Sequence, residues 1–367
     1  MGTTTRPPRL SWTTVAPVLA LVVLALSWGR DPGPVLVVVV AAALVGAVLA
    51  AVHHAEVVAH RVGEPFGSLV LAVAVTVIEV GLIVTLMVSG GDEAASLARD
   101  TVFAAVMITC NGILGLSLLL GALRHDVVEF NREGAGAALA TVLTLAVMCL
   151  VLPTFTTSRP GPEFSTAQLT FAALASLVLY AAFVVTQTIR HRDFFLPVSP
   201  GGAVLEDEDA HADPPSSRAA LTSLGLLVVA LVAVVGLAKV ESPAIEDGVA
   251  AIGFPQSFVG VVIALLVLAP ETLAAANAAR RDRLQTSLNL ALGSAMASIG
   301  LTIPAIAVAT IWLEGPLLLG LGSTQMVLLA VTVVVAVLTV VPGRATRLQG
   351  VVHLVLLAGF LFLAVAP

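Results

Sequence analysis

Charged residues are scarce in this chain of 367 residues. Asp, Glu, Lys and Arg make up 11% of the sequence, whereas a soluble domain typically holds about 25%. This number of charged residues is too small to cover the surface of a soluble globular protein. The composition therefore excludes a soluble enzyme, a disordered protein and a nucleic-acid partner. Hydrophobic residues make up 58%, and the mean hydropathy is +1.05. A lipid environment is the simplest explanation.

Aromatic residues and cysteines are also few. Aromatics make up 5% of the chain, with one Tyr and three Trp. A transmembrane barrel needs aromatic girdles and alternating strands, but the apolar runs here are long and unalternated. Because only helices and closed barrels satisfy their backbone in lipid, we predict an all-α membrane protein. Cys110 and Cys149 lie inside apolar runs, which does not indicate a disulfide framework.

Eleven apolar stretches are predicted to cross the membrane, where a spanning helix needs about 20 residues. A long polar stretch, 190–218, interrupts them. The sequence predicts an N-terminal transmembrane helix in 1–33, five helices in 34–190, an acidic linker in 191–218 and five helices in 219–367. The expected spans are 13–29, 34–53, 66–90, 100–122, 135–153, 167–189, 219–238, 254–278, 286–312, 317–341 and 347–366.

The distribution of Lys and Arg predicts the orientation. With the N-terminus in the cytoplasm, 13 basic residues fall in cytoplasmic segments and 4 in outer segments. Basic residues concentrate on the cytoplasmic side of membrane proteins. We therefore expect a multi-pass protein of the cell membrane (the inner or plasma membrane), with a cytoplasmic N-terminus, a cytoplasmic linker and the C-terminus outside.

Two carboxylates are predicted near the middle of the membrane. Glu79 lies in the third span and Glu271 in the eighth, while every other carboxylate is expected at a span end or in a loop. Ionisable residues at this depth are costly and are candidates for function. Setting the first span aside leaves two halves of five, and each Glu falls in the second span of its half. An odd number of spans per half requires opposite orientations, which is the inverted-repeat plan of secondary transporters.

Six short segments around the two glutamates form a recognisable set: 63–68 (GEPFGS), 74–79 (AVTVIE), 98–103 (ARDTVF), 110–112 (CNG), 269–271 (APE) and 287–294 (SLNLALGS). With these segments, the chain resembles the bacterial calcium/proton antiporters of the ChaA type. These belong to the cation/proton exchanger branch of the cation/calcium exchanger superfamily. The resemblance extends from about residue 52 to about residue 304 of the chain.

The resemblance implies a fold of eleven helices with an acidic segment between the sixth and seventh. It also implies that both glutamates serve the transport site. The family pattern places an Asn three residues before each intramembrane Glu, and here those positions are Thr76 and Leu268. Thr76 keeps an oxygen on the helix face of Glu79, whereas Leu268 supplies none.

Calcium prefers six to eight oxygen ligands, carboxylates among them. The two glutamates are predicted to bind either the cation or protons, which would couple the two fluxes by alternating access. The chain is therefore expected to exchange cytosolic Ca²⁺ for H⁺ without a cofactor. Sodium or potassium exchange with protons stays open as an alternative. The predicted cation and proton ligands are Glu79, Glu271, Thr76, Asn111, Ser294 and Ser298, with Thr109 and Asn289 as nearby candidates.

Two further polar groups have functional and structural interpretations. His53, Glu56 and His60 share one helix face at the inner end of the second span, and Glu64 follows. They are candidates for cation access or proton relay, or they form an ordinary polar helix end. The acidic residues Glu206, Asp207, Glu208 and Asp209 could regulate transport, although acidic runs are usually solvated linkers.

Other functional classes lack their residues. A lipid phosphate hydrolase would need Arg or Lys to hold phosphate, and none lies in mid-span. A zinc-protease motif and a phosphate-binding loop are absent, and Lys239 is the only lysine. We therefore expect a transporter and no enzyme, with lipid, calcium and protons as its partners. The sequence leaves a homo-oligomer open.

Overall fold

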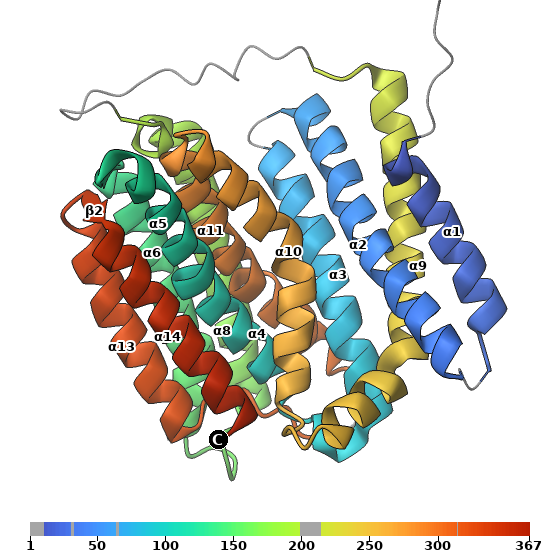
Figure 1. The fold of residues 1–367 in the computed structure, drawn as a ribbon. Helices are drawn as coiled ribbons and strands as arrows, with labels where there is room; N and C mark the ends of the chain where they lie inside the picture. The colour runs from blue at the N-terminus through green and yellow to red at the C-terminus, as the bar shows by residue number, and fades with distance from the viewer. Residues whose placement is uncertain (1–10, 31–32, 64–65, 199–213, 314) are drawn as a thin grey trace, which may run out of the picture.

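The computed structural model describes residues 11–30, 33–63, 66–198, 214–313 and 315–367. Within them, ten helical segments are long and apolar enough to cross a membrane, and a shorter apolar helix precedes them. The predicted all-α membrane fold is confirmed. Figure 1 shows the helices running side by side in one bundle.

The first half of the chain begins with α1 (Trp12–Ser27), α2 (Pro34–Val62) and α3 (Phe66–Gly90). A short turn of 3₁₀-helix follows (Gly91–Ala94). Three of its later spans contain π-helical turns, which widen the helix locally. These spans are α4 (Leu97–Met107), η2 (Ile108–Ile113) and α5 (Leu114–His125); α6 (Arg132–Ala146), η3 (Val147–Val151) and α7 (Leu152–Phe155); and α8 (Thr166–Val185) with η4 (Thr186–Arg190).

The second half follows a short 3₁₀ turn, η5 (Arg192–Phe195), and the connection to α9. Its helices are α9 (Ser217–Ala251), α10 (Phe258–Arg280), α11 (Leu284–Gly300), α12 (Thr302–Ala309), α13 (Ser323–Val340) and α14 (Arg347–Val365). We call the end of the bundle where α8 ends and α9 begins the connector end, at the top of Figure 1. The C-terminus lies at the opposite end.

A small antiparallel ribbon joins the two halves. Strand β1 (Val127–Glu129) pairs with β2 (Arg344–Thr346), with Val128 opposite Ala345. Each strand lies directly beside a helix terminus, so the ribbon ties the end of α5 to the start of α14.

The buried apolar residues form two clusters. One is built by α1, α2 and α9 together with residues of α3 and α10. The other is built mainly by α4 to α8 and α10 to α14. Figure 1 shows α1, α2 and α9 on one side and α5, α6, α13 and α14 on the other, with α3 and α10 between them. The two helices that carry Glu79 and Glu271 therefore lie at the border between the two cores.

Three predicted span limits were wrong. Helix α2 continues nine residues past the expected end at 53, and α9 continues to Ala251 instead of ending at 238. Polar residues end an apolar run, but they do not end a helix whose backbone hydrogen bonds continue. The tenth predicted span, which is α13, starts at Ser323 and not at 317. Residues 317–321 are extended there, because Leu317, Leu319 and Leu321 are buried alternately and the backbone bonds to other segments.

Candidate functional site

Glu79 lies in the middle of α3 with its side chain 2% exposed. Its Oε2 accepts hydrogen bonds from Ser298 Oγ and Thr302 Oγ1, both at 3.0 Å. Its Oε1 is buried and has no hydrogen-bond partner among the described residues. A carboxyl group in an apolar interior is stable when it is protonated or when it binds a cation. The arrangement can therefore hold either a proton or a cation at Glu79.

The two hydroxyl groups come from a broken helix. Helix α11 ends at Gly300, and α12 begins at Thr302. Pro304 in the first turn of α12 has no N–H to donate to the carbonyl of Gly300, which explains the interruption there. Ser298 and Thr302 are four residues apart, so both still face α3 across the break. Ser298 was predicted, whereas Thr302 was missed, although its spacing from Ser298 was a usable signal.

Glu271 lies on α10 directly after Pro270. The proline cannot donate to the carbonyl of Leu266, so the helix is weakened beside the carboxyl group. Glu271 is half-buried, and its Oε2 has no hydrogen-bond partner among the described residues. It lines a cavity of about 230 Å³, together with Ser294 of α11.

The cavity extends from Glu271 towards the connector end. Its other lining residues come from the connector-end parts of three helices: Leu71 of α3, Gln187 of η4, and Thr286 and Asn289 of α11. Most of the wall is apolar, and Glu271 is the one carboxylate among the residues that line it. A cation could reach the carboxyl group from that end.

The structure brings the two predicted glutamates towards each other. Glu79 and Glu56 are the charged side chains that act electrostatically on Glu271. Three carboxylates from α2, α3 and α10 thus face the same region. Like charges repel at short range, so this region favours bound protons or a bound cation over three free carboxylates.

The predicted access residues are only partly gathered. Glu56 is close to Glu271, and His53 acts electrostatically on Glu56. The ring of His53 stands edge-on to that of His54 at 5.4 Å. His60 is exposed at the end of α2. The remaining predicted access and regulatory residues lie outside the described residues: Glu64, Glu206, Asp207, Glu208 and Asp209.

The predicted oxygen ligands divide into two groups. Ser298 contacts Glu79, Ser294 lines the cavity of Glu271, and Thr76 is buried with a hydroxyl group that has no partner among the described residues. These three lie around the glutamates. Thr109 instead donates to the Ala105 carbonyl of its own helix at 2.7 Å. Asn289 donates to the carbonyl of Phe195 at 2.8 Å, so its amide holds the start of the connection to α9.

Asn111 has its hydrogen-bond partners in a second polar cluster. Its amide nitrogen donates to Thr332 Oγ1 at 3.0 Å, and its amide oxygen lies 3.1 Å from His353 Nδ1. His353 is fully buried, and its Nε2 contacts Thr339 Oγ1 at 3.1 Å. These partners belong to α13 and α14, whereas Glu79 bonds to α11 and α12. The role of Asn111 as a cation ligand therefore stays a prediction.

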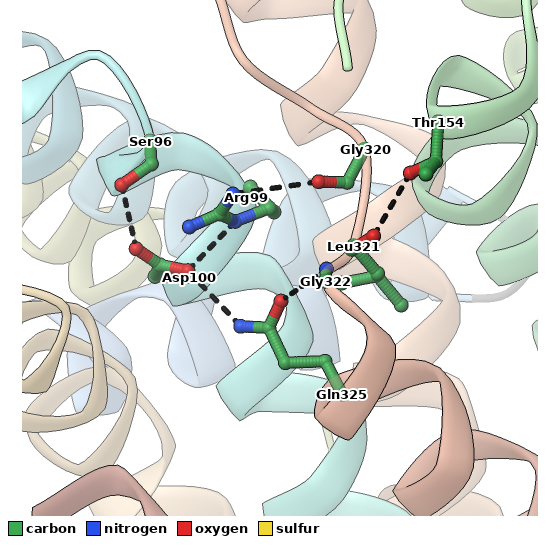
Figure 2. A network of polar contacts seen from close by, with 8 residues as sticks. All are labelled: Ser96, Arg99, Asp100, Thr154, Gly320, Leu321, Gly322 and Gln325. Carbon is green, nitrogen blue, oxygen red and sulfur yellow. Dashed lines mark hydrogen bonds and ion pairs between the residues drawn. The ribbon is translucent and has the colours of Figure 1, made fainter. Parts of the chain in front are cut away.

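A polar network lies at the opposite end of the bundle, shown in Figure 2. Buried Asp100 accepts from Ser96 Oγ and Arg99 Nε, both at 2.8 Å, and from Gln325 Nε2 at 3.2 Å. Arg99 donates to the carbonyl of Gly320, and Thr154 Oγ1 donates to the carbonyl of Leu321 at 2.9 Å. The extended segment before α13 is thus fixed to α4 and α7.

Sequence reasoning missed two buried carboxylates. Asp100 and Glu241 are both 4% exposed and lie within helices. Asp100 lies at a span end, as expected of the other carboxylates, but Glu241 lies inside α9, so for Glu241 that expectation was wrong. Asp100 lies in the first turn of α4, where the network compensates its charge. Among the described residues, no group of three or more His, Cys, Asp or Glu side chains could hold a metal ion.

Comparison with known proteins extends over nearly the whole chain. The sequence profile of the family described as sodium/calcium exchanger protein matches residues 32–189 and 222–366. The chain is 45% identical to the ionic transporter y4hA of Sinorhizobium fredii, over 97% of this chain and 96% of that one. It is 36% identical to the sodium-potassium/proton antiporter ChaA of Escherichia coli, over 95% and 94%.

The fold also matches a solved structure. The H⁺/Ca²⁺ exchanger CAX superposes with a TM-score of 0.72 at 16% identity, over 95% of this chain and 86% of that one. At this identity the likeness shows the fold alone.

Proposed function

Because the chain belongs to the sodium/calcium exchanger protein family, we propose that it exchanges cations for protons at a site formed by Glu79 and Glu271. Membership confirms the resemblance seen in the sequence. The chain is a multi-pass membrane antiporter of the cation exchanger type. Relatives of this kind are transporters, and our proposal includes no enzymatic activity and no cofactor.

The site assignment rests on two intramembrane glutamates, each with one oxygen that has no hydrogen-bond partner among the described residues. Glu79 Oε1 and Glu271 Oε2 are both buried without a partner among the described residues. Each oxygen can accept a proton or bind a cation, but a free charge there would be costly. If the site always holds either the cation or protons when it changes its access, cation movement in one direction drives proton movement in the opposite direction.

We assign supporting roles to the neighbours of the two glutamates. Ser298 and Thr302 stabilise the negatively charged form of Glu79 through hydrogen bonds. Thr76 and Ser294 are further oxygen ligands for the cation. Glu56 attracts cations into the cavity beside Glu271, with His53 next to it. Backbone carbonyls beside Pro270 and Pro304 would complete the oxygen set.

The internal division follows the two glutamates. We propose two inverted five-helix repeats, 34–190 and 219–367, after an N-terminal helix in 1–33 and around a connector in 191–218. The family match falls into two segments with nearly these limits. The excess of Arg in the segments at the connector end supports a cytoplasmic connector and a C-terminus outside the cell. The cavity of Glu271 would then face the cytoplasm.

Calcium is the first candidate for the transported cation. Two carboxylates supply two negative charges, which match a divalent ion surrounded by oxygen ligands. Sodium or potassium is the second candidate, favoured by the similarity to the sodium-potassium/proton antiporter over nearly the full length. Both candidates use the same residues and differ in the number of oxygen ligands at the site.

Everted membrane vesicles with an imposed proton gradient test the proposal. Calcium, sodium and potassium are added in parallel, and proton release is followed with a pH-sensitive dye. We expect a calcium response that disappears in Glu271→Gln and persists in Glu133→Gln, an exposed carboxylate on α6. A response to sodium or potassium alone would keep the site and change the substrate. Normal exchange in Glu271→Gln would refute the assignment of the site.

A further inference from the structure

A third carboxylate, Glu241 of α9, is buried in the bundle and has no role in the site described above. Its side chain is 4% exposed, and its Oε2 is buried without a hydrogen-bond partner among the described residues. Within the same part of the chain it forms no ion pair. An unpaired buried carboxylate is costly, so its presence calls for a function that needs it.

Glu241 lies between Glu79 and the opposite end of the bundle. Helix α9 runs beside α3 in the same direction, as two pairs of positions show. A Cβ atom on Gly81 would lie 2.6 Å from Val235 Cγ2, and a Cβ atom on Gly90 would lie 3.5 Å from Glu246 Oε1. At a rise of about 1.5 Å per residue, Glu241 is about 9 Å beyond Val235, and Glu79 is about 3 Å before Gly81. The levels of the two carboxylates along the bundle therefore differ by about 12 Å.

Helix α9 loses a backbone hydrogen bond next to this residue. Pro243 lies inside α9 and cannot donate to the carbonyl of Lys239. Figure 1 shows α9 bending in its lower part. Ser242 Oγ donates to Glu246 Oε1 at 3.1 Å, and Glu246 lines a small cavity of about 10 Å³ with Asp100. Polar atoms thus continue from Glu241 to the opposite end.

The described side chains around Glu241 do not neutralise the charge of its carboxylate. Residues 34–50 of α2 and 80–90 of α3, which lie at its level, contain no charged side chain. On α9 itself, Lys239 is held 5.2 Å from the ring of Trp28 of α1, and Glu246 carries the same sign as Glu241. A proton is the simplest partner for a carboxyl group in this position.

The other half of the chain has a counterpart. Glu56 is 22 residues beyond the first residue of α2, and Glu241 is 24 beyond the first residue of α9. Helices α2 and α9 are the first helices of the two proposed repeats, and they run in opposite directions. Glu56 approaches Glu271 from the connector end, so the inverted arrangement puts Glu241 on the opposite side of Glu79.

We propose that Glu241 is a proton relay that carries protons between the opposite end of the bundle and Glu79. The inference rests on the proposed antiport function. The Glu241 carboxylate takes a proton from water at that end, and the proton then passes to the Glu79 carboxylate when the cation has left. Only O–H bonds form and break: the O–H bond of Glu241 breaks as that of Glu79 forms, and water at the opposite end then protonates Glu241 again.

The test separates two modes of exchange in proteoliposomes that contain the full-length protein. Glu241→Gln keeps the shape of the side chain and removes its titratable proton. We expect cation/proton exchange to fall by about ten-fold or more and to lose its dependence on the pH at the opposite end. Isotope exchange of the same cation across the membrane without a proton gradient needs no relay, so we expect it to be unchanged. Asp247→Asn, at an exposed position on the same helix, is the matched control.

Each result has a defined meaning. A wild-type pH profile in Glu241→Gln, or equal loss of both exchange modes, would overturn the relay. If Glu241→Gln does not accumulate, Glu241→Asp keeps a carboxyl group and should retain proton-coupled exchange with an altered pH profile, whereas an unaltered profile would count against the relay. Glu79→Gln should lose both modes, and if it kept cation exchange, the proposed site itself would fail, whatever Glu241→Gln does.

Discussion

Glu79 and Glu271 hold corresponding places in the two halves of the chain, but their surroundings differ. Glu79 is enclosed, and two hydroxyl groups bond to it. Glu271 is half-buried and faces a cavity that extends to the connector end. An exchanger that alternates access needs one side closed while the other is open. The cavity beside Glu271 gives the connector end a path towards the transport site, whereas Glu79 is enclosed by α11 and α12.

Removing either charge should have the largest effect. We expect Glu79→Gln and Glu271→Gln each to abolish cation/proton exchange, because neither variant can alternate between proton and cation. Transport in vesicles measures the loss, and thermal stability in detergent confirms that the variants fold. If only one of the two variants were inactive, the two positions would differ in function as well as in surroundings.

The hydroxyl groups at Glu79 sharpen the comparison. Ser298→Ala removes a hydrogen bond to a charged group, which is worth about 1.5–3 kcal/mol, or about ten- to a hundred-fold in cation affinity. Thr302→Val should act similarly, and calorimetric titration with the transported cation measures both. Thr170→Ala is the control, since its hydroxyl bonds only to its own helix. An unchanged affinity in both variants would show that the hydroxyl groups serve packing alone.

Thiol labelling can compare access to the transport site from the two ends of the bundle. The native cysteines, Cys110 and Cys149, are fully buried, so an introduced cysteine can be followed alone. We expect Ser294→Cys, in the cavity of Glu271, to react with a membrane-impermeant thiol reagent from the connector end. Ser298→Cys, 2% exposed, should stay protected. Reaction of Ser294→Cys from the opposite end only would reverse the assignment of the open side.

Asn111 tests whether the second polar cluster is structural. Asn111→Ala removes one hydrogen-bond partner from each of Thr332 and His353, at a cost of about 1–3 kcal/mol. We expect a lower melting temperature with unchanged cation affinity. A large loss of affinity with normal stability would return Asn111 to the transport site.

The connector should have the smallest effect. Deleting residues 205–213 is expected to leave exchange intact at saturating cation, because the site lies on α3, α10, α11 and α12. Vesicle transport over a range of cation concentrations measures any change in concentration dependence. Complete loss at saturation would give the acidic segment a direct role in transport.

Prediction from sequence succeeded where a single physical rule dominated. Long apolar runs required helices in lipid, and two isolated glutamates stood out at mid-membrane depth. It failed where the direction of a side chain decided the outcome. The bonds of Asn111 to Thr332 and His353 were not foreseen, Thr302 was overlooked, and Glu241 was taken for a residue beyond the end of a span. The apolar run of α9 ends near Ala238, but the helix continues past Pro243.

The sequence by itself determined the membrane environment and the helical class, because composition and long apolar runs respond to the solvent of the chain. Its short motifs identified the family. The tertiary structure decided which oxygens meet. Ser298 and Thr302 contact Glu79 because α11 is broken opposite α3, and Glu271 is accessible because a cavity opens between α3, α8 and α11. Such contacts depend on how helices far apart in the chain pack against each other, and no local pattern of residues specifies that packing.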